Sequence, residues 1–162
     1  MKPTSSNSSL THVNADGNAQ IVDVTDRAST MRTAKVKGKV LHSEQVRNLI
    51  AENAVSKGSV IDVSRIAAIM GAKKTSELIP LCHPLAITGI EIEYVLLEDG
   101  IEISAFVKTT DRTGVEMEAF TAVAVGALAV IDMIKSIDSY ASITEIRLVE
   151  KSGGKNGDWI RN

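Results

Sequence analysis

The chain has 162 residues, of which 44% are hydrophobic and 23% are charged, which is enough apolar mass for the core of one globular domain. The net charge of −2 and the aromatic content of 3% argue against a general nucleic-acid surface and against stacking platforms for single strands. One cysteine and three histidines allow no internal disulfide framework and show no zinc-ligand spacing.

The first residues are rich in Ser, Thr and Asn and lack an apolar signal region. We expect residues 1–20 to form a disordered or loosely ordered tail, because they cannot bury apolar area. The longest apolar run, Ala119 to Ile131, is shorter than the roughly 20 residues of a membrane span. These features predict a cytoplasmic protein.

The ordered chain is expected to begin near Ile21. Residues 33–41 alternate apolar residues with Lys35, Lys37 and Lys39, which predicts a strand whose lysines favour a sheet edge. Ser43 is a candidate N-cap for a helix that ends near Asn53.

A turn at Lys57-Gly58 precedes a second expected helix over 62–77. Its pattern places Ile66, Ile69 and Met70 toward the core and Arg65, Lys73 and Lys74 outward. From composition alone, the favoured interpretation of Lys57 is a solvated lysine in a loop.

Residues 79–85 read Ile-Pro-Leu-Cys-His-Pro-Leu. Each proline fixes its own φ and favours an extended conformation before it, so His83 should stand on a stiff segment suited to a functional side chain. A satisfied structural histidine is an equally good interpretation, and Cys82 fits a small packed hydrophobe better than a nucleophile.

Two strands follow at 87–97 and 100–109, joined by a turn at Glu98-Asp-Gly100, and a last strand is expected over 143–149. The end, Lys151-Ser-Gly-Gly-Lys155, could form a backbone nest for phosphate, although a frayed terminus is the simpler interpretation. Residues 156–162 are assigned to a C-terminal tail.

Residues 114–137 predict one long helix with small residues along its middle and an Asp132–Lys135 pair near its end. A solvated ion pair is the ordinary interpretation, but the apolar neighbours suggest a pair that is used in chemistry. Glu118 and Asp132 lie about 40° apart around this helix and about 21 Å apart along it. We therefore hypothesise a site shared between antiparallel subunits.

The element order predicts an α+β fold, with a ferredoxin-like antiparallel sheet of about four strands and helices packed on one face. Oligomerisation would cover the remaining surfaces. Residues 21–155 are expected to form a single catalytic domain.

Four motifs occur in order: Leu78-Ile-Pro-Leu-Cys-His-Pro-Leu85, Thr113-Gly-Val-Glu-Met-Glu-Ala119, Asp132-Met-Ile-Lys135 and Lys151-Ser-Gly-Gly-Lys155. Together with Leu10-Thr-His-Val-Asn14 they resemble the cyclic pyranopterin monophosphate synthase family, the C protein of molybdenum cofactor biosynthesis. The resemblance extends from about Leu10 to Asp158.

The resemblance implies a lyase that converts 3′,8-cyclo-7,8-dihydroguanosine 5′-triphosphate into cyclic pyranopterin monophosphate and releases pyrophosphate. It implies no organic cofactor, leaves open an Mg²⁺ ion with the triphosphate, and implies a hexamer built as a trimer of dimers. It places catalytic roles on Asp132, Lys135 and Lys57. Substrate-contact positions fall on Leu81, Cys82, His83, Met117 and Glu118, and further polar matches on Glu116, Lys73, Arg65 and Lys151.

Two other classes of function remain open on the sequence. A pterin- or nucleotide-binding module would have the same pocket and form no product. A ferredoxin-like RNA-binding or purely structural oligomer is disfavoured by the few aromatic residues and the acidic net charge.

Overall fold

A computed structural model describes residues 12–14, 16–154 and 157–162. Most of the predicted tail over residues 1–20 therefore lies outside the described residues. Lys155, the last residue of the predicted phosphate nest, also lies outside them. The described chain forms, in order, β1 (Thr30–Leu41), α1 (Glu44–Ala51), α2 (Val60–Lys73), α3 (Thr75–Leu78), β2 (Ile87–Leu96), β3 (Gly100–Asp111), α4 (Glu116–Ile134), β4 (Ser142–Ser152) and β5 (Trp159–Ile160).

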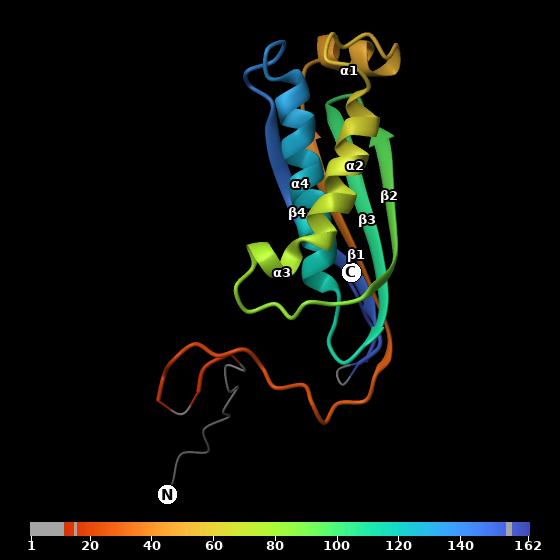
Figure 1. Cartoon of the computed structure of the whole chain (residues 1–162). Helices are drawn as coiled ribbons and strands as arrows, with labels where there is room; N and C mark the ends of the chain where they lie inside the picture. The colour runs from red at the N-terminus through yellow and green to blue at the C-terminus, as the bar shows by residue number, and fades with distance from the viewer. Residues whose placement is uncertain (1–11, 15, 155–156) are drawn as a thin grey trace, which may run out of the picture.

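The strands form one antiparallel sheet in the order β2-β3-β1-β4-β5. Helices α2 and α4 run side by side over one face of this sheet, whereas α1 lies at the end of the molecule far from the N-terminal segment (Figure 1). This arrangement confirms the α+β, ferredoxin-like prediction. Strand β5, a two-residue strand that pairs with Glu150 and Lys151, was not predicted, because residues 156–162 were assigned to a tail.

Strand β1 occupies the centre of the sheet, between β3 and β4, so the expectation of an edge position was wrong. Its apolar side chains Ala34, Val36 and Val40 are fully buried beneath the helices. Its lysines lie on the opposite face, where Lys37 pairs with Glu102 and Lys39 with Asp99, each at 2.7 Å. The alternation of apolar residues and lysines along β1 thus reflects a sheet with one face covered by helices and one charged face.

Helix α2 buries a different stripe from the predicted one. Ile66 and Met70 are 61% and 53% exposed, so their inward assignment was wrong, whereas Ile69 packs against the core. The buried positions include Ser64, Ala68 and Ala72, which follow one another at intervals of one turn. Small residues face α4 because the two helices approach closely, and the Ser64 hydroxyl donates a 2.8 Å hydrogen bond to the Gly126 carbonyl.

Helix α4 begins at Glu116 and ends at Ile134, slightly inside the predicted range of 114–137. Its small residues pack against α2 and the sheet, as the sequence predicted, with Ala119, Ala122 and Ala127 fully buried. By length and composition alone α4 could cross a membrane. Its buried residues instead form the centre of the core, which accounts for the same apolar composition.

Candidate active site

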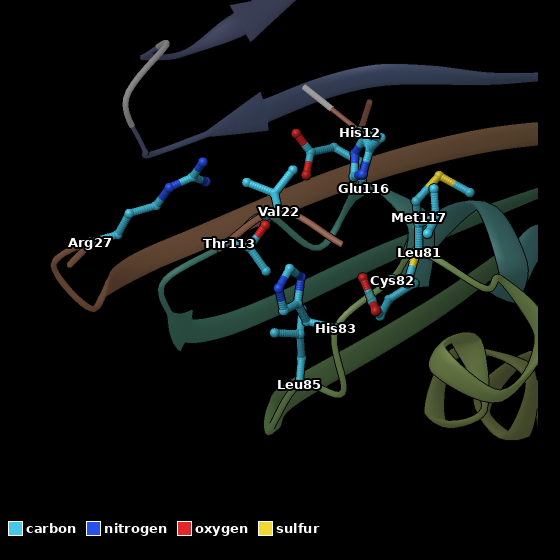
Figure 2. Close-up of a pocket in the computed structure, with 12 residues that line it drawn as sticks. His12, Val22, Arg27, Leu81, Cys82, His83, Leu85, Thr113, Glu116 and Met117 are labelled. Carbon is cyan, nitrogen blue, oxygen red and sulfur yellow. The ribbon is translucent and has the colours of Figure 1, made fainter. Parts of the chain in front are cut away.

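A pocket of about 480 Å³ lies at the start of α4, where several of the predicted motifs meet. Three segments distant in sequence meet there: the chain before β1, the proline-flanked loop before β2, and the turn into α4 (Figure 2). The pocket is lined by His12, Val22, Arg27, Leu81, Cys82, His83, Leu85, Thr113, Gly114, Glu116, Met117 and Glu118.

The loop over 79–86 contributes Leu81, Cys82 and His83 to this pocket, three of the positions that the family resemblance places in contact with substrate. The loop is tightened by a hydrogen bond in which the Cys82 backbone N–H donates to the Ile79 carbonyl at 3.1 Å. Burial and the nearby Glu118 carboxylate raise the pKa of the Cys82 thiol. A raised thiol pKa disfavours the thiolate, which agrees with a packing role over a nucleophilic one.

Glu118 is the buried acid of the pocket, with a side chain that is only 4% exposed. Burial raises its pKa to about 7, and the negative charge of Glu116 acts in the same direction. Glu118 also lines a second, smaller cavity of about 200 Å³ together with Lys73. An acid with a pKa of about 7 can hold or release a proton at neutral pH.

A cationic recess adjoins the pocket and shares Arg27, Thr113, Gly114 and Glu116 with it. Lys151 on β4 pairs with Glu116 at 2.9 Å, and Arg32 on β1 donates to the Asp111 carbonyl at 3.0 Å. Three cationic side chains at one end of the sheet are suited to hold an anion such as phosphate.

The glycines at this recess behave only partly as the sequence suggested. Gly153 and Gly154 have φ values of +84° and +83°, which L residues with a Cβ rarely adopt. However, the Gly153 N–H donates to the Asp158 carboxylate at 3.0 Å, so this backbone donor is already used and is not available to bind a phosphate.

His12, Arg27 and Arg32 were not predicted as site residues. His12 was assigned to the loose tail, and Arg27 and Arg32 flank the start of β1 with no motif of their own. The available signals were the Leu10-Thr-His-Val-Asn14 motif, which contains His12, and a pair of arginines close to the first strand.

The second cluster of predicted residues lies at the opposite end of α4. Asp132 pairs with Lys135 at 2.7 Å and with Lys57 at 3.6 Å, and the Lys57 ammonium donates to the Asp132 backbone carbonyl at 2.7 Å. Hydrogen bonding to Lys135 and the charges of Lys135 and Lys57 lower the pKa of Asp132. Asp132 is thus an ionised acceptor held between two cations.

The prediction that this pair lies in apolar surroundings was wrong for the single chain. The side chains of Asp132 and Lys135 are both 61% exposed, and that of Lys57 is 41% exposed. The apolar neighbours Val130, Met133 and Ile134 point toward the core, so the charged residues occupy the outer face of the last helical turn.

Two further predicted residues lie apart from the pocket near His83. Arg65 stacks on the Tyr94 ring at 5.2 Å and donates to the Ile92 carbonyl on the edge strand β2. Lys73 lies behind Glu118, in the smaller cavity. Among the residues that the structure describes, no group of three His, Cys, Asp or Glu side chains is arranged to hold a metal ion.

The fold and the pocket define a ferredoxin-like α+β protein with a buried acid and a cationic recess suited to a small anionic molecule. Comparison with known proteins makes the assignment specific: residues 21–154 match the MoaC family model, and the chain belongs to the MoaC family. A relative from Streptomyces avermitilis, named cyclic pyranopterin monophosphate synthase, is 53% identical over 94% of this chain and 90% of its own length. A Desulforamulus reducens protein of the same name is 49% identical, covering 95% of this chain and 94% of its own.

Proposed function

We propose that this chain is a lyase that converts 3′,8-cyclo-7,8-dihydroguanosine 5′-triphosphate into cyclic pyranopterin monophosphate and pyrophosphate, in molybdenum cofactor biosynthesis. The observation that carries the proposal is the pocket at the start of α4. Residues of two motifs that resemble the family, in 78–85 and 113–119, line this pocket, and a cationic recess adjoins it. The substrate is a small molecule, and the proposal places the enzyme in the cytoplasm.

The chemistry requires a sugar hydroxyl to attack the α-phosphorus while pyrophosphate departs, and proton transfers to rebuild the purine as a pterin. Arg27, Arg32 and Lys151 are suited to bind the phosphates, because all three line the recess. Glu118 and His83 face the main pocket, where the ring system would lie. A Mg²⁺ ion that accompanies the triphosphate is compatible with this arrangement, and we propose no organic cofactor.

Asp132, Lys135 and Lys57 are proposed as the catalytic cluster. Asp132 can accept a proton, and the two lysines can donate protons or neutralise developing phosphate charge. These groups lie about 21 Å along α4 from Glu118, so one substrate cannot reach both clusters of the same chain. The site therefore requires two chains.

The outer surface of the helix layer supports this shared site. Leu128 on α4 is 59% exposed, and Ile66 and Met70 on α2 are 61% and 53% exposed. Leu128 lies one and two turns before Asp132 and Lys135, on the same outward face of α4. We propose that this face packs against a second copy in antiparallel orientation, bringing the Asp132 cluster of one chain to the Glu118 pocket of the other. Three such dimers would form a hexamer.

The test is incubation with the cyclised triphosphate and measurement of pyrophosphate and pterin product. Wild type should release both in equal amounts, whereas folded Asp132→Asn and Lys135→Ala variants should lose turnover. Binding of substrate without pyrophosphate release would instead identify a binding module.

A further inference from the structure

Lys57 is the member of the catalytic cluster that lies far in sequence from α4, whereas Asp132 lies in its last turn and Lys135 directly follows it. It lies in the loop between α1 and α2, and its position depends on how that loop is held. Its ammonium reaches the last turn of α4, donating to the Asp132 carbonyl at 2.7 Å. A long lysine side chain in an exposed loop keeps such a contact only if its backbone is anchored nearby.

Helix α1, which leads into this loop, is short and stands apart from the main helix layer (Figure 1). It has eight residues, of which Val46 and Ile50 are buried. A helix of two turns has little stability of its own, so its placement depends on a few fixed points.

One of these fixed points is Asp138, in the turn that follows α4. Its Oδ2 accepts a 2.7 Å hydrogen bond from the backbone N–H of Ser43, the N-cap of α1. Its Oδ1 accepts from the Tyr140 N–H at 3.0 Å, and its own N–H donates to the Ile134 carbonyl at 3.0 Å. The Ser43 N–H bond is the largest cause of a lowered pKa for Asp138, which keeps this acceptor ionised.

Ser43 is held from its other side as well. Its carbonyl lies 3.1 Å from Nδ1 of His42, and its hydroxyl accepts from the Val46 N–H at 3.5 Å. The segment over 43–57 is therefore tied to the end of α4 at both of its ends, by Ser43–Asp138 and by Lys57–Asp132.

We propose that Asp138 is a positioning residue for Lys57: it fixes the first residue of α1 to the end of α4, and the segment so anchored presents Lys57 to Asp132. This inference rests on the proposed function, in which Lys57 is catalytic. Asp138 itself contacts Ser43 and its own turn, and acts on the reaction through the loop.

The kinetic test is a double-mutant cycle on pyrophosphate release. Asp138→Ala should lower kcat/KM about tenfold. Whichever of kcat and KM changes in Lys57→Ala should also change in Asp138→Ala. When Asp138→Ala is added to Lys57→Ala, kcat/KM should fall by less than about a further twofold. Asp138→Asn retains an oxygen acceptor for the Ser43 N–H and should recover most of the activity. Equal losses in both backgrounds would show a general structural effect and overturn the proposal.

The second measurement is amide hydrogen exchange, which needs no turnover. Asp138→Ala should speed exchange in residues 43–58 and leave 79–86 unchanged, while Asp138→Asn should resemble wild type. The matched control is Asp99→Ala, which also removes an exposed carboxylate. Asp99 contacts the neighbouring residue through its backbone, because its carbonyl accepts a hydrogen bond from the His42 N–H. Unchanged exchange in Asp138→Ala would overturn the proposal even if the wild-type reaction were confirmed. If wild type released no pyrophosphate, the function would fail while exchange still reported on the anchor.

Discussion

Glu118 and Asp132 lie on the same helix, and the fold gives them opposite environments. Glu118, in the first turn of α4, is 4% exposed and has a pKa raised to about 7. The side chain of Asp132, in the last turn, is 61% exposed and has a lowered pKa. One helix thus supplies a group that can hold a proton at neutral pH and another that remains ionised, at opposite ends.

Mixed dimers should distinguish a shared site from two separate ones. Glu118→Ala and Asp132→Asn should each be inactive alone. Co-expression or joint refolding should restore about a quarter of wild-type activity per subunit, because half of the dimers are mixed and each mixed dimer has one intact site. Pyrophosphate release from the unfractionated mixture measures this, and tagged, purified mixed dimers should reach about half of wild-type activity.

The control for that experiment is a mixture of Asp132→Asn and Lys135→Ala. Both residues come from the same cluster, so no mixed dimer contains an intact site. Recovery in this control, or its absence in the first mixture, would contradict a site built from the two ends of α4 in different chains.

The pKa of Glu118 predicts a pH-dependent stability. Below its ordinary value of 4.5 the carboxyl is protonated in both folded and unfolded chains and imposes no penalty. As the pH rises from about 4.5 to about 7, the unfolded chain loses this proton first, so stability falls by at most about 3 kcal/mol and then levels off. Glu118→Gln should remove this fall.

Chemical denaturation of the two proteins at pH 5 and pH 8 measures the effect. The Gln variant should gain stability relative to wild type only at pH 8. Glu91→Gln, on the exposed outer side of the edge strand β2, is the matched control and should show no such difference. A constant offset between wild type and Glu118→Gln at both pH values would show that burial does not control the Glu118 proton.

Most of the fold follows from local sequence patterns. The period-two alternation predicted β1, β2 and β3, and Ser43 was correctly identified as an N-cap because its hydroxyl accepts from Val46. The face of α2 was not predictable from hydrophobicity alone, because close packing on α4 selects Ser64 and Ala68 over the larger Ile66 and Met70. The central position of β1 depends on long-range pairing, which its lysines do not report.

The site was predictable where residues are adjacent in sequence and not where separate segments meet. The proline-flanked loop and the first turn of α4 do converge in one pocket. Arg27 reaches the cationic recess from the chain before β1 and Arg32 from the start of β1, so no local motif marks them. Asp132 is exposed because it lies on the side of α4 that faces away from the sheet. The number of apolar residues near it in the sequence does not predict which side of the helix faces the sheet.

Lys151 should contribute to binding of the triphosphate. It pairs with Glu116 at 2.9 Å beside Arg27 and Arg32, so its removal takes one cation from the recess. Lys151→Ala should raise KM about tenfold with a smaller change in kcat, as expected for one charge-assisted hydrogen bond to phosphate. Initial rates over a range of substrate concentrations measure both constants.

Lys35→Ala provides the control, because Lys35 lies on the charged face of the sheet, away from the recess. It should leave KM within about twofold of wild type. If both lysine variants raised KM equally, the overall charge of the protein and not the recess would account for the effect.

Leu128 should report on the proposed dimer surface. Its side chain is 59% exposed on the outer face of α4, so Leu128→Asp costs little core packing in the single chain. In a dimer that buries this face, an unpaired carboxylate at the interface is costly and should shift the protein toward monomer. Light scattering coupled to size exclusion should show the smaller mass, and pyrophosphate release should fall in parallel because the partner's cluster is lost. Tyr140→Asp, at a side chain that is 93% exposed beyond the end of α4, introduces the same charge and should change neither mass nor rate. An unaltered mass for Leu128→Asp would show that the two ends of α4 are not joined across this face.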